Sequence, residues 1–165
     1  MGGESTVLRK ILIMTFDDNY LKDIGEIIFE RKIQINKEKG VYNYENKNKN
    51  VIYTILSNNV RRTWIHHYLG AYGIIIINEG DKINENNMEI ENILNSQILQ
   101  KKPLLLVYDK KKILEKNNKY LEELRYNLSN KKIKYNVIYI DFNTNRSKSE
   151  LFYGLDWMHK QITKI

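Results

Sequence analysis

A short apolar run followed at once by polar turn residues is the feature that most constrains the fold of this chain. Residues 11–14 (Ile-Leu-Ile-Met) are continuously apolar, which is typical of a strand covered by helices on both faces. Asp17, Asp18 and Asn19 follow, and such side chains accept hydrogen bonds from free backbone N–H groups in turns and at helix starts. A corner of this kind carries a glycine-rich phosphate loop in many α/β proteins. Here the loop has no glycine.

The rest of the chain alternates between strand and helix patterns. Continuous apolar runs predict further buried strands at 73–78 and 103–108, and a last strand is predicted at 135–140. Helical spacing of apolar residues predicts helices at 20–32, 57–68, 88–99 and 117–128, and a last helix from 147. A period of two between 33 and 56 predicts strands from Ile33, Val41 and Val51, the last two joined as a hairpin about a polar tip. A capping box of Ser147 and Glu150 is expected to open the last helix.

These patterns predict an α/β protein with a mostly parallel sheet, one antiparallel excursion at the hairpin, and helices on both faces. The length of 165 residues fits one domain, which we place at residues 10–165 after an N-terminal segment at 1–9.

Composition excludes several chemistries. The chain has no cysteine, and hence no disulfide, thiolate zinc site or cysteine nucleophile. His66 and His67 are adjacent on a predicted helix and diverge, so no metal site is expected. No apolar run approaches the ~20 residues of a membrane-spanning helix. The net charge of +7 suits an acidic partner, but the abundance of Lys, Asn, Ile and Tyr is equally typical of A/T-rich codons. No RNA-binding motif accompanies the lysines, so nucleic acid is not the expected partner.

The N-terminus carries a loose lipidation pattern. Met1–Thr6 reads Met-Gly-Gly-Glu-Ser-Thr, which matches the motif for N-myristoylation of Gly2. One myristoyl chain gives only marginal membrane affinity, so the expected location is cytoplasmic, with peripheral membrane contact.

Four stretches resemble the ADP-ribosylation factor (Arf) family of small GTPases. Leu151–Met158 (Leu-Phe-Tyr-Gly-Leu-Asp-Trp-Met) resembles the family's closing helix, and Arg61–Tyr68 resembles the helix after its second switch. Gly73–Ile77 resembles the next strand, and Leu105–Lys110 the strand that leads to guanine recognition. An acylated Gly2 fits the family as well. The resemblance implies a Ras-like α/β fold with six strands, GTP or GDP with magnesium as cofactor, GTP hydrolysis, protein partners and a role in vesicle traffic.

The family's phosphate motif is not preserved. The pattern G-x-x-x-x-G-K-[ST] lets backbone N–H groups approach phosphate while the lysine neutralises it. The matching positions hold Thr15, Tyr20, Leu21 and Lys22, and Asp17 lies between them. Both glycines, the lysine and the magnesium-binding hydroxyl are therefore replaced.

The second-switch and base-binding motifs are also lost. The family's second switch needs an Asp and a Gly, but no Asp occurs between Asp23 and Asp81 and no Gly between residues 40 and 70. Guanine recognition needs N-K-x-D, and residues 109–112 are Asp109, Lys110, Lys111 and Lys112, so a cation replaces the carboxylate that binds the base. The last base contact aligns with Asn145.

We therefore predict an Arf-like pseudo-GTPase, a protein-interaction module without a catalytic residue, metal or cofactor. Its vestigial nucleotide pocket is formed by Asp17, Tyr20, Leu21, Lys22, Asp109, Lys110, Lys112 and Asn145. One alternative is an atypical, weakly GTP-binding member of the family in intracellular transport. A third is a basic surface that binds RNA or anionic lipid.

Overall fold

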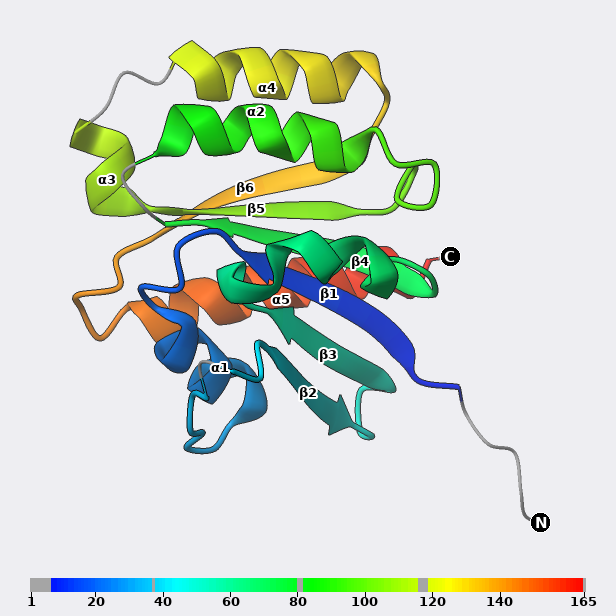
Figure 1. Cartoon of the computed structure of the whole chain (residues 1–165), viewed down its shortest axis with the longest axis vertical. Helices are drawn as coiled ribbons and strands as arrows, with labels where there is room; N and C mark the ends of the chain where they lie inside the picture. The colour runs from blue at the N-terminus through cyan, green and yellow to red at the C-terminus, as the bar shows by residue number, and fades with distance from the viewer. Residues whose placement is uncertain (1–6, 37, 80–81, 116–118, 165) are drawn as a thin grey trace.

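The computed structural model describes residues 7–36, 38–79, 82–115 and 119–164, and a sheet of six strands runs through its centre (Figure 1). The strand order is β2-β3-β1-β4-β5-β6, in which β2 is antiparallel to β3 and every other neighbouring pair is parallel. The strands are β1 (Arg9–Thr15), β2 (Val41–Asn46), β3 (Val51–Leu56), β4 (Ala71–Asn78), β5 (Leu104–Asp109) and β6 (Tyr135–Ile140). The predicted sheet of six strands with one antiparallel member is confirmed.

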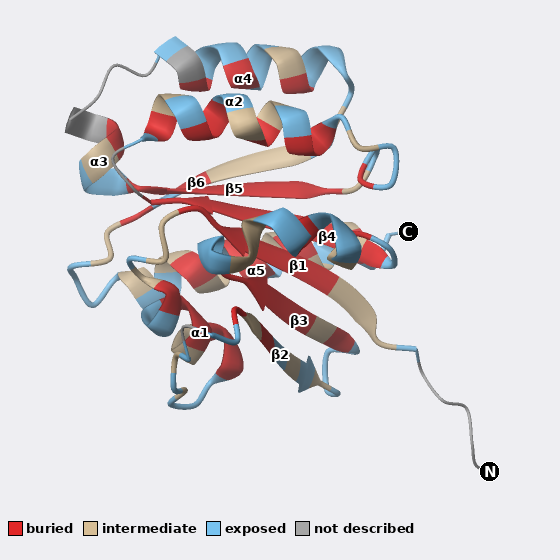
Figure 2. Ribbon diagram, in the orientation of Figure 1, coloured by how far each residue is buried: buried red, intermediate tan, exposed pale blue. Residues whose placement is uncertain are grey.

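Helices cover both faces of this sheet (Figures 1 and 2). The helical elements are α1 (Leu21–Phe29), the 3₁₀ helix η1 (Asn58–His67), α2 (Ile83–Leu94), α3 (Lys110–Glu115), α4 (Lys119–Asn130) and α5 (Ser147–Ile162). Residues of α1 and α5 share one apolar core, and residues of η1, α2, α3 and α4 share the other.

The four isoleucines of β4 show why the apolar runs form central strands. Ile74 and Ile76 belong to the core under α2 and α4, whereas Ile75 and Ile77 belong to the core under α1 and α5. Successive side chains of a strand point to opposite faces, so a strand buried on both faces must be apolar at every position. All four side chains are fully buried.

Three local predictions are wrong for identifiable reasons. The helix predicted at 88–99 is observed at 83–94, because the polar residues Asn86 and Asn87 face inward, where both hydrogen-bond Asn78. No strand forms at 33–36, where Tyr42 hydrogen-bonds the Asn36 backbone instead. The predicted capping box is absent: Glu150 accepts a hydrogen bond from the Asp141 backbone N–H, and the helix begins without a side-chain cap.

None of the described helices combines the length and apolar character that a membrane span requires. Gly2 lies outside the described residues, so its acylation stays a prediction.

Candidate functional site

The loops that follow β1, β4, β5 and β6 lie together at the carboxyl edge of the parallel part of the sheet (Figure 1). Ligands of open α/β sheets bind at this edge. The residues after β1 that we predicted for the nucleotide pocket are Asp17, Tyr20, Leu21 and Lys22. The topology brings them to the same edge of the sheet as the predicted pocket residues after β5 and β6.

Tyr20 joins three of these loops. Its ring stacks on Phe142 of the loop after β6, with 4.2 Å between ring centroids and 9° between ring planes. Its hydroxyl donates a hydrogen bond to the carboxylate of Asp109, which ends β5 and is almost fully buried. Burial raises the pKa of Tyr20, and the Asp109 carboxylate adds to the shift. The side chain thus spans the edge of the sheet from the β1 loop to the loops of β5 and β6.

The two residues after Tyr20 have opposite environments. Leu21 is the first residue of α1 and is buried in the core shared by α1 and α5. Lys22 is largely exposed, and its ammonium lies 4.0 Å from the Glu26 carboxylate one turn later. A pairing of Asp109 with Lys22 or Arg146, which the charges suggest, is not formed. Asp109 instead accepts hydrogen bonds from Tyr20 and from the Lys111 backbone N–H, at 3.0 Å in the latter case.

The backbone of the β1 loop is bound by Glu79, the residue that follows β4 and is fully buried. Glu79 Oε1 accepts a hydrogen bond of 3.3 Å from the Asp17 N–H, and the carboxylate also accepts from the Tyr20 N–H. Burial raises the pKa of Glu79 to about 8; the two N–H donors oppose the shift, and the nearby charges of Asp18 and Asp17 reinforce it. The sequence did not lead us to single out Glu79. A charged residue directly after a buried strand could have been recognised as a candidate for this edge of the sheet.

Asp18 ties the β1 loop to the segment after β3. Its carboxylate accepts hydrogen bonds from the hydroxyls of Thr15 and Ser57, both at 2.6 Å, and from the Asn58 N–H at 2.9 Å. The backbone of Asp18 is left-handed, with φ of 60°. Arg61 of η1 adds a further link, because its guanidinium donates to the Phe16 carbonyl and lies over the Phe16 ring. The sequence predicted Asp18 as a turn residue but could not name these partners.

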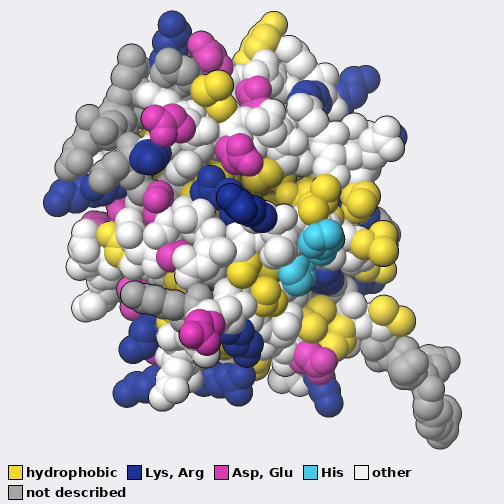
Figure 3. Space-filling view, in the orientation of Figure 1, with side chains coloured by type: hydrophobic (Ala, Val, Ile, Leu, Met, Phe, Trp, Pro, Cys, Tyr) yellow, Lys and Arg dark blue, Asp and Glu magenta, His cyan; other side chains and the backbone are white. Residues whose placement is uncertain are grey.

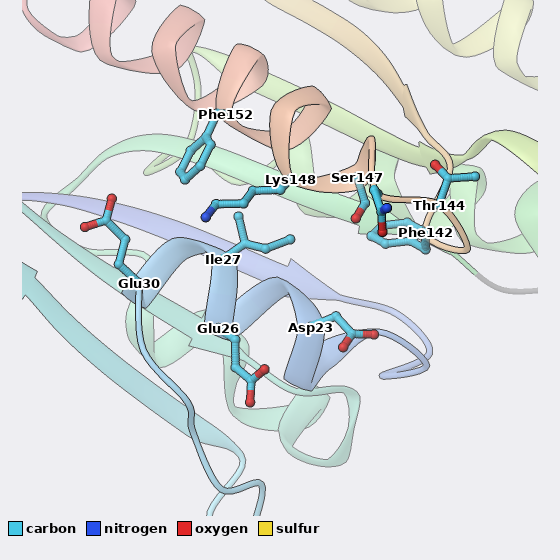
Figure 4. A pocket seen from close by; sticks show the side chains of 10 residues that line it. Asp23, Glu26, Ile27, Glu30, Phe142, Thr144, Ser147, Lys148 and Phe152 are labelled. Carbon is cyan, nitrogen blue, oxygen red and sulfur yellow. The ribbon is translucent and has the colours of Figure 1, made fainter.

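The residues after β5 and β6 are less enclosed. Lys110 is exposed and Lys112 is half-buried. Asn145 is exposed and lines a cavity of about 700 Å³ between α1 and the start of α5 (Figure 4).

That cavity is predominantly acidic. Asp23 and Glu26 of α1 and Glu30 just after it line one side, and Lys148 of α5 is the only cation among the described residues that line the cavity. A second cavity of about 400 Å³ lies against the β1 loop and is lined by Asp17, Asp18 and Lys22 among others. Carboxylates outnumber cations among the described lining residues of both cavities, and like charges disfavour an anion there. Within the described ranges, no group of three or more His, Cys, Asp or Glu residues is arranged to hold a metal ion.

Two comparisons with known proteins place the fold. The family model described as ADP-ribosylation factor family matches residues 56–162, so the β1 loop lies outside the matched range. A structure described as an ADP-ribosylation factor-like GTP-binding protein, the small COPII coat GTPase SAR1 from Encephalitozoon cuniculi in complex with GDP, superposes with a TM-score of 0.59. That match has 15% sequence identity and covers 94% of this chain and 80% of the other, so it supports the fold alone. Because the family model matches well over half of its residues, the chain belongs to the Arf family.

Proposed function

We propose that this protein is an Arf-family pseudo-GTPase that has lost tight GTP binding and hydrolysis and acts as a protein-interaction module. The observation that carries the proposal is the Tyr20 bridge, in which one side chain stacks on Phe142 and hydrogen-bonds Asp109. The family's phosphate motif has a glycine at the position of Tyr20, because the backbone there must approach phosphate closely. Tyr20 instead adds an aromatic ring at that position, held by Phe142 and Asp109.

Charge at the base-binding position supports the same conclusion. Lys112 stands where the family carries the carboxylate that accepts hydrogen bonds from guanine. A hydrogen bond to a charged group contributes about 1.5–3 kcal/mol, and about 1.4 kcal/mol corresponds to a tenfold change in affinity. Losing this contact together with the phosphate lysine, which is Leu21 here, removes several decades of affinity for GTP.

The Asp18 contacts supply what a ligand supplies in a working GTPase. There, the phosphate loop and the second switch meet through magnesium and the γ-phosphate. Here the Asp18 carboxylate joins Thr15 directly to Ser57 and Asn58. A ligand that binds only the folded state stabilises it through mass action. A fold whose loops are joined by its own side chains does not need that contribution.

A surface for protein partners lies over η1, in the region that resembles the helix after the second switch. Ile65 of η1 and Leu69 just after it are 58% and 77% exposed. Figure 3 shows hydrophobic side chains beside histidines on this face. Exposed apolar residues in one place are typical of interaction sites. Acylation of Gly2 and peripheral membrane contact in vesicle traffic belong to the same proposal.

Family membership favours one alternative, a weak GTP-binding protein in intracellular transport with magnesium as cofactor. The net charge of +7 is the basis of a third, an RNA or anionic-lipid surface. Binding that weakens steeply with salt would favour the third over the other two.

Nucleotide content of the purified protein separates the proposal from its main alternative. We expect protein purified with magnesium present to release no guanine nucleotide on denaturation, as measured by chromatography of the supernatant. An Arf-family GTPase with an intact phosphate motif, treated identically, serves as the positive control. Guanine nucleotide released in proportion to protein would contradict the pseudo-GTPase proposal and favour the alternative.

A further inference from the structure

The amino ends of the parallel strands meet at the edge of the sheet opposite the candidate site (Figure 1). Arg9 at the start of β1 pairs with Val51 of β3, and Leu104 at the start of β5 pairs with Tyr135 of β6. The segments that lead into these strands therefore lie together at what we call the amino edge. They are residues 7–8 before β1, 47–50 before β3, 68–70 before β4, 95–103 before β5 and 131–134 before β6.

The amino edge carries positive charge that no acidic residue of these segments compensates. The chain has 20 Asp and Glu residues, and none of them lies in the five segments. The nearest acid in sequence is Glu45, two positions before the tip between β2 and β3. A/T-rich codons account for many lysines, but not for their gathering without acids at one edge. The cations are exposed, except for the half-buried Lys102, and are Lys47, Lys49, Lys101, Lys102, Lys131, Lys132 and Lys134.

The same edge carries exposed aliphatic side chains among these cations. Val7 is 76% exposed, Leu69 77% and Ile98 43%, and each belongs to one of the five segments. Figure 3 shows hydrophobic side chains along this side of the molecule. Proteins that lie on anionic bilayers combine the two kinds of residue, because apolar side chains enter the headgroup boundary while cations attract the charged lipids.

The exposed aromatic residues lie elsewhere. Among the described residues they are Tyr126 of α4, Tyr139 of β6 and Tyr153 of α5, all outside the five segments. Proteins that bind single-stranded nucleic acid combine a basic groove with aromatic rings on which the bases stack. A surface of lysines with aliphatic rather than aromatic side chains fits a bilayer better than it fits RNA.

We propose that the amino edge is a docking surface for a bilayer that contains anionic phospholipid. This inference rests on the proposed function, because it names the surface and the lipid of its peripheral membrane contact. Gly2 stands five positions before Val7, so covalent geometry keeps an acyl chain there within about 18 Å of the edge. One acyl chain gives only marginal affinity, and a basic surface supplies the second signal that stable anchoring requires.

The test is sedimentation of the full chain with vesicles of phosphatidylcholine, with or without about one third phosphatidylserine. Gly2→Ala in every protein removes acylation, so that binding reports on the folded surface alone. We expect this protein to bind only the vesicles that contain phosphatidylserine. Lys132→Gln with Lys134→Gln should weaken that binding at least tenfold, because each lysine near an anionic surface contributes about fivefold.

Lys110→Gln with Lys111→Gln is the matched control, because it removes the same charge from two exposed lysines at the opposite edge of the sheet. It should bind as the Gly2→Ala protein does. Leu69→Ser tests the apolar contact, and we expect it to weaken vesicle binding at least about threefold. All substituted side chains are exposed, and the melting temperature of each variant checks that it is folded.

Four results would overturn the inference: no binding to the anionic vesicles, equal binding of the two lysine variants, equal binding to both kinds of vesicle, or no loss in Leu69→Ser. Single-stranded RNA bound more tightly than the anionic vesicles would overturn it as well, and would assign the edge to nucleic acid. The two proposals fail separately. Guanine nucleotide bound to the wild-type protein contradicts the pseudo-GTPase function, whereas vesicle binding that does not depend on the amino edge contradicts only this surface.

Discussion

At the scale of single residues, the carboxyl group of Glu79 has surroundings that link stability to pH. Burial raises its pKa from 4.5 to about 8. Because the folded state then holds a proton that the unfolded state has already released, the free energy of unfolding decreases as pH rises between these two values. Above pH 8 the folded protein carries an ionised, fully buried carboxylate close to Asp17 and Asp18.

Glu79→Gln should remove this dependence. We expect the variant to gain stability relative to the wild-type protein as pH rises from about 5 to about 9, by up to about 1.4 kcal/mol per pH unit across the titration. Urea denaturation at both ends of the range measures it, and Glu122→Gln on α4 is the control for loss of one charge. A difference between Glu79→Gln and wild type that does not change with pH would contradict the raised pKa.

The sequence singled out the motif positions but not the partners that the residues there have in the structure. Tyr20, Leu21 and Lys112 stand out because the family requires glycine, lysine and a carboxylate at those positions. Glu79 and Asp18 could not be assigned, since their partners lie 62 and about 40 positions away and are set by strand register. Apolar periodicity carries no information about such polar pairs.

At the scale of elements, the predicted strands and helices agree with the structure where the spacing of apolar residues alone determines the element. The runs that form β1, β4 and β5 are apolar because these strands are buried under helices, whereas the edge strand β6 is only partly buried. The prediction was wrong for the start of α2, where Asn86 and Asn87 are buried and paired, so that polar residues face the core. The segment predicted as a helix at 57–68 is a 3₁₀ helix that is interrupted at Val60.

The junction of the β1 loop and α1 should not tolerate the family's own residues. Tyr20→Gly with Leu21→Lys removes the stacked ring and places an ammonium where Leu21 is 3% exposed. Large-to-small core changes cost about 2–5 kcal/mol, and an unpaired buried charge adds to this. We expect the double variant to lose at least about 3 kcal/mol in the free energy of unfolding, measured by urea denaturation.

Asn19→Gly is the control for added backbone freedom in the same loop, because Asn19 is exposed. Its cost should stay below about 1 kcal/mol. A double variant as stable as the wild-type protein would show that Tyr20 and Leu21 do not hold the edge of the sheet closed.

At the scale of the whole molecule, the chain has the family fold, and its own side chains link the loops at the carboxyl edge of the sheet. Tyr20 joins the loops after β1, β5 and β6; Asp18 joins the first of them to the start of η1; and Glu79 binds its backbone. The fold was predictable because alternating strands and helices and the family-like stretches span most of the chain. The links between these loops were not predictable, because they are contacts that only the folded sheet brings together.

The response of thermal stability to nucleotide is the most direct test of this account. A ligand that binds only the folded state raises the melting temperature, and the shift grows with the ratio of the ligand concentration to its Kd. We predict no shift of the wild-type melting temperature in millimolar GTP or GDP with magnesium, and none on adding EDTA. A dose-dependent upward shift with GDP and magnesium that EDTA reverses would contradict the account and show a working guanine-nucleotide site.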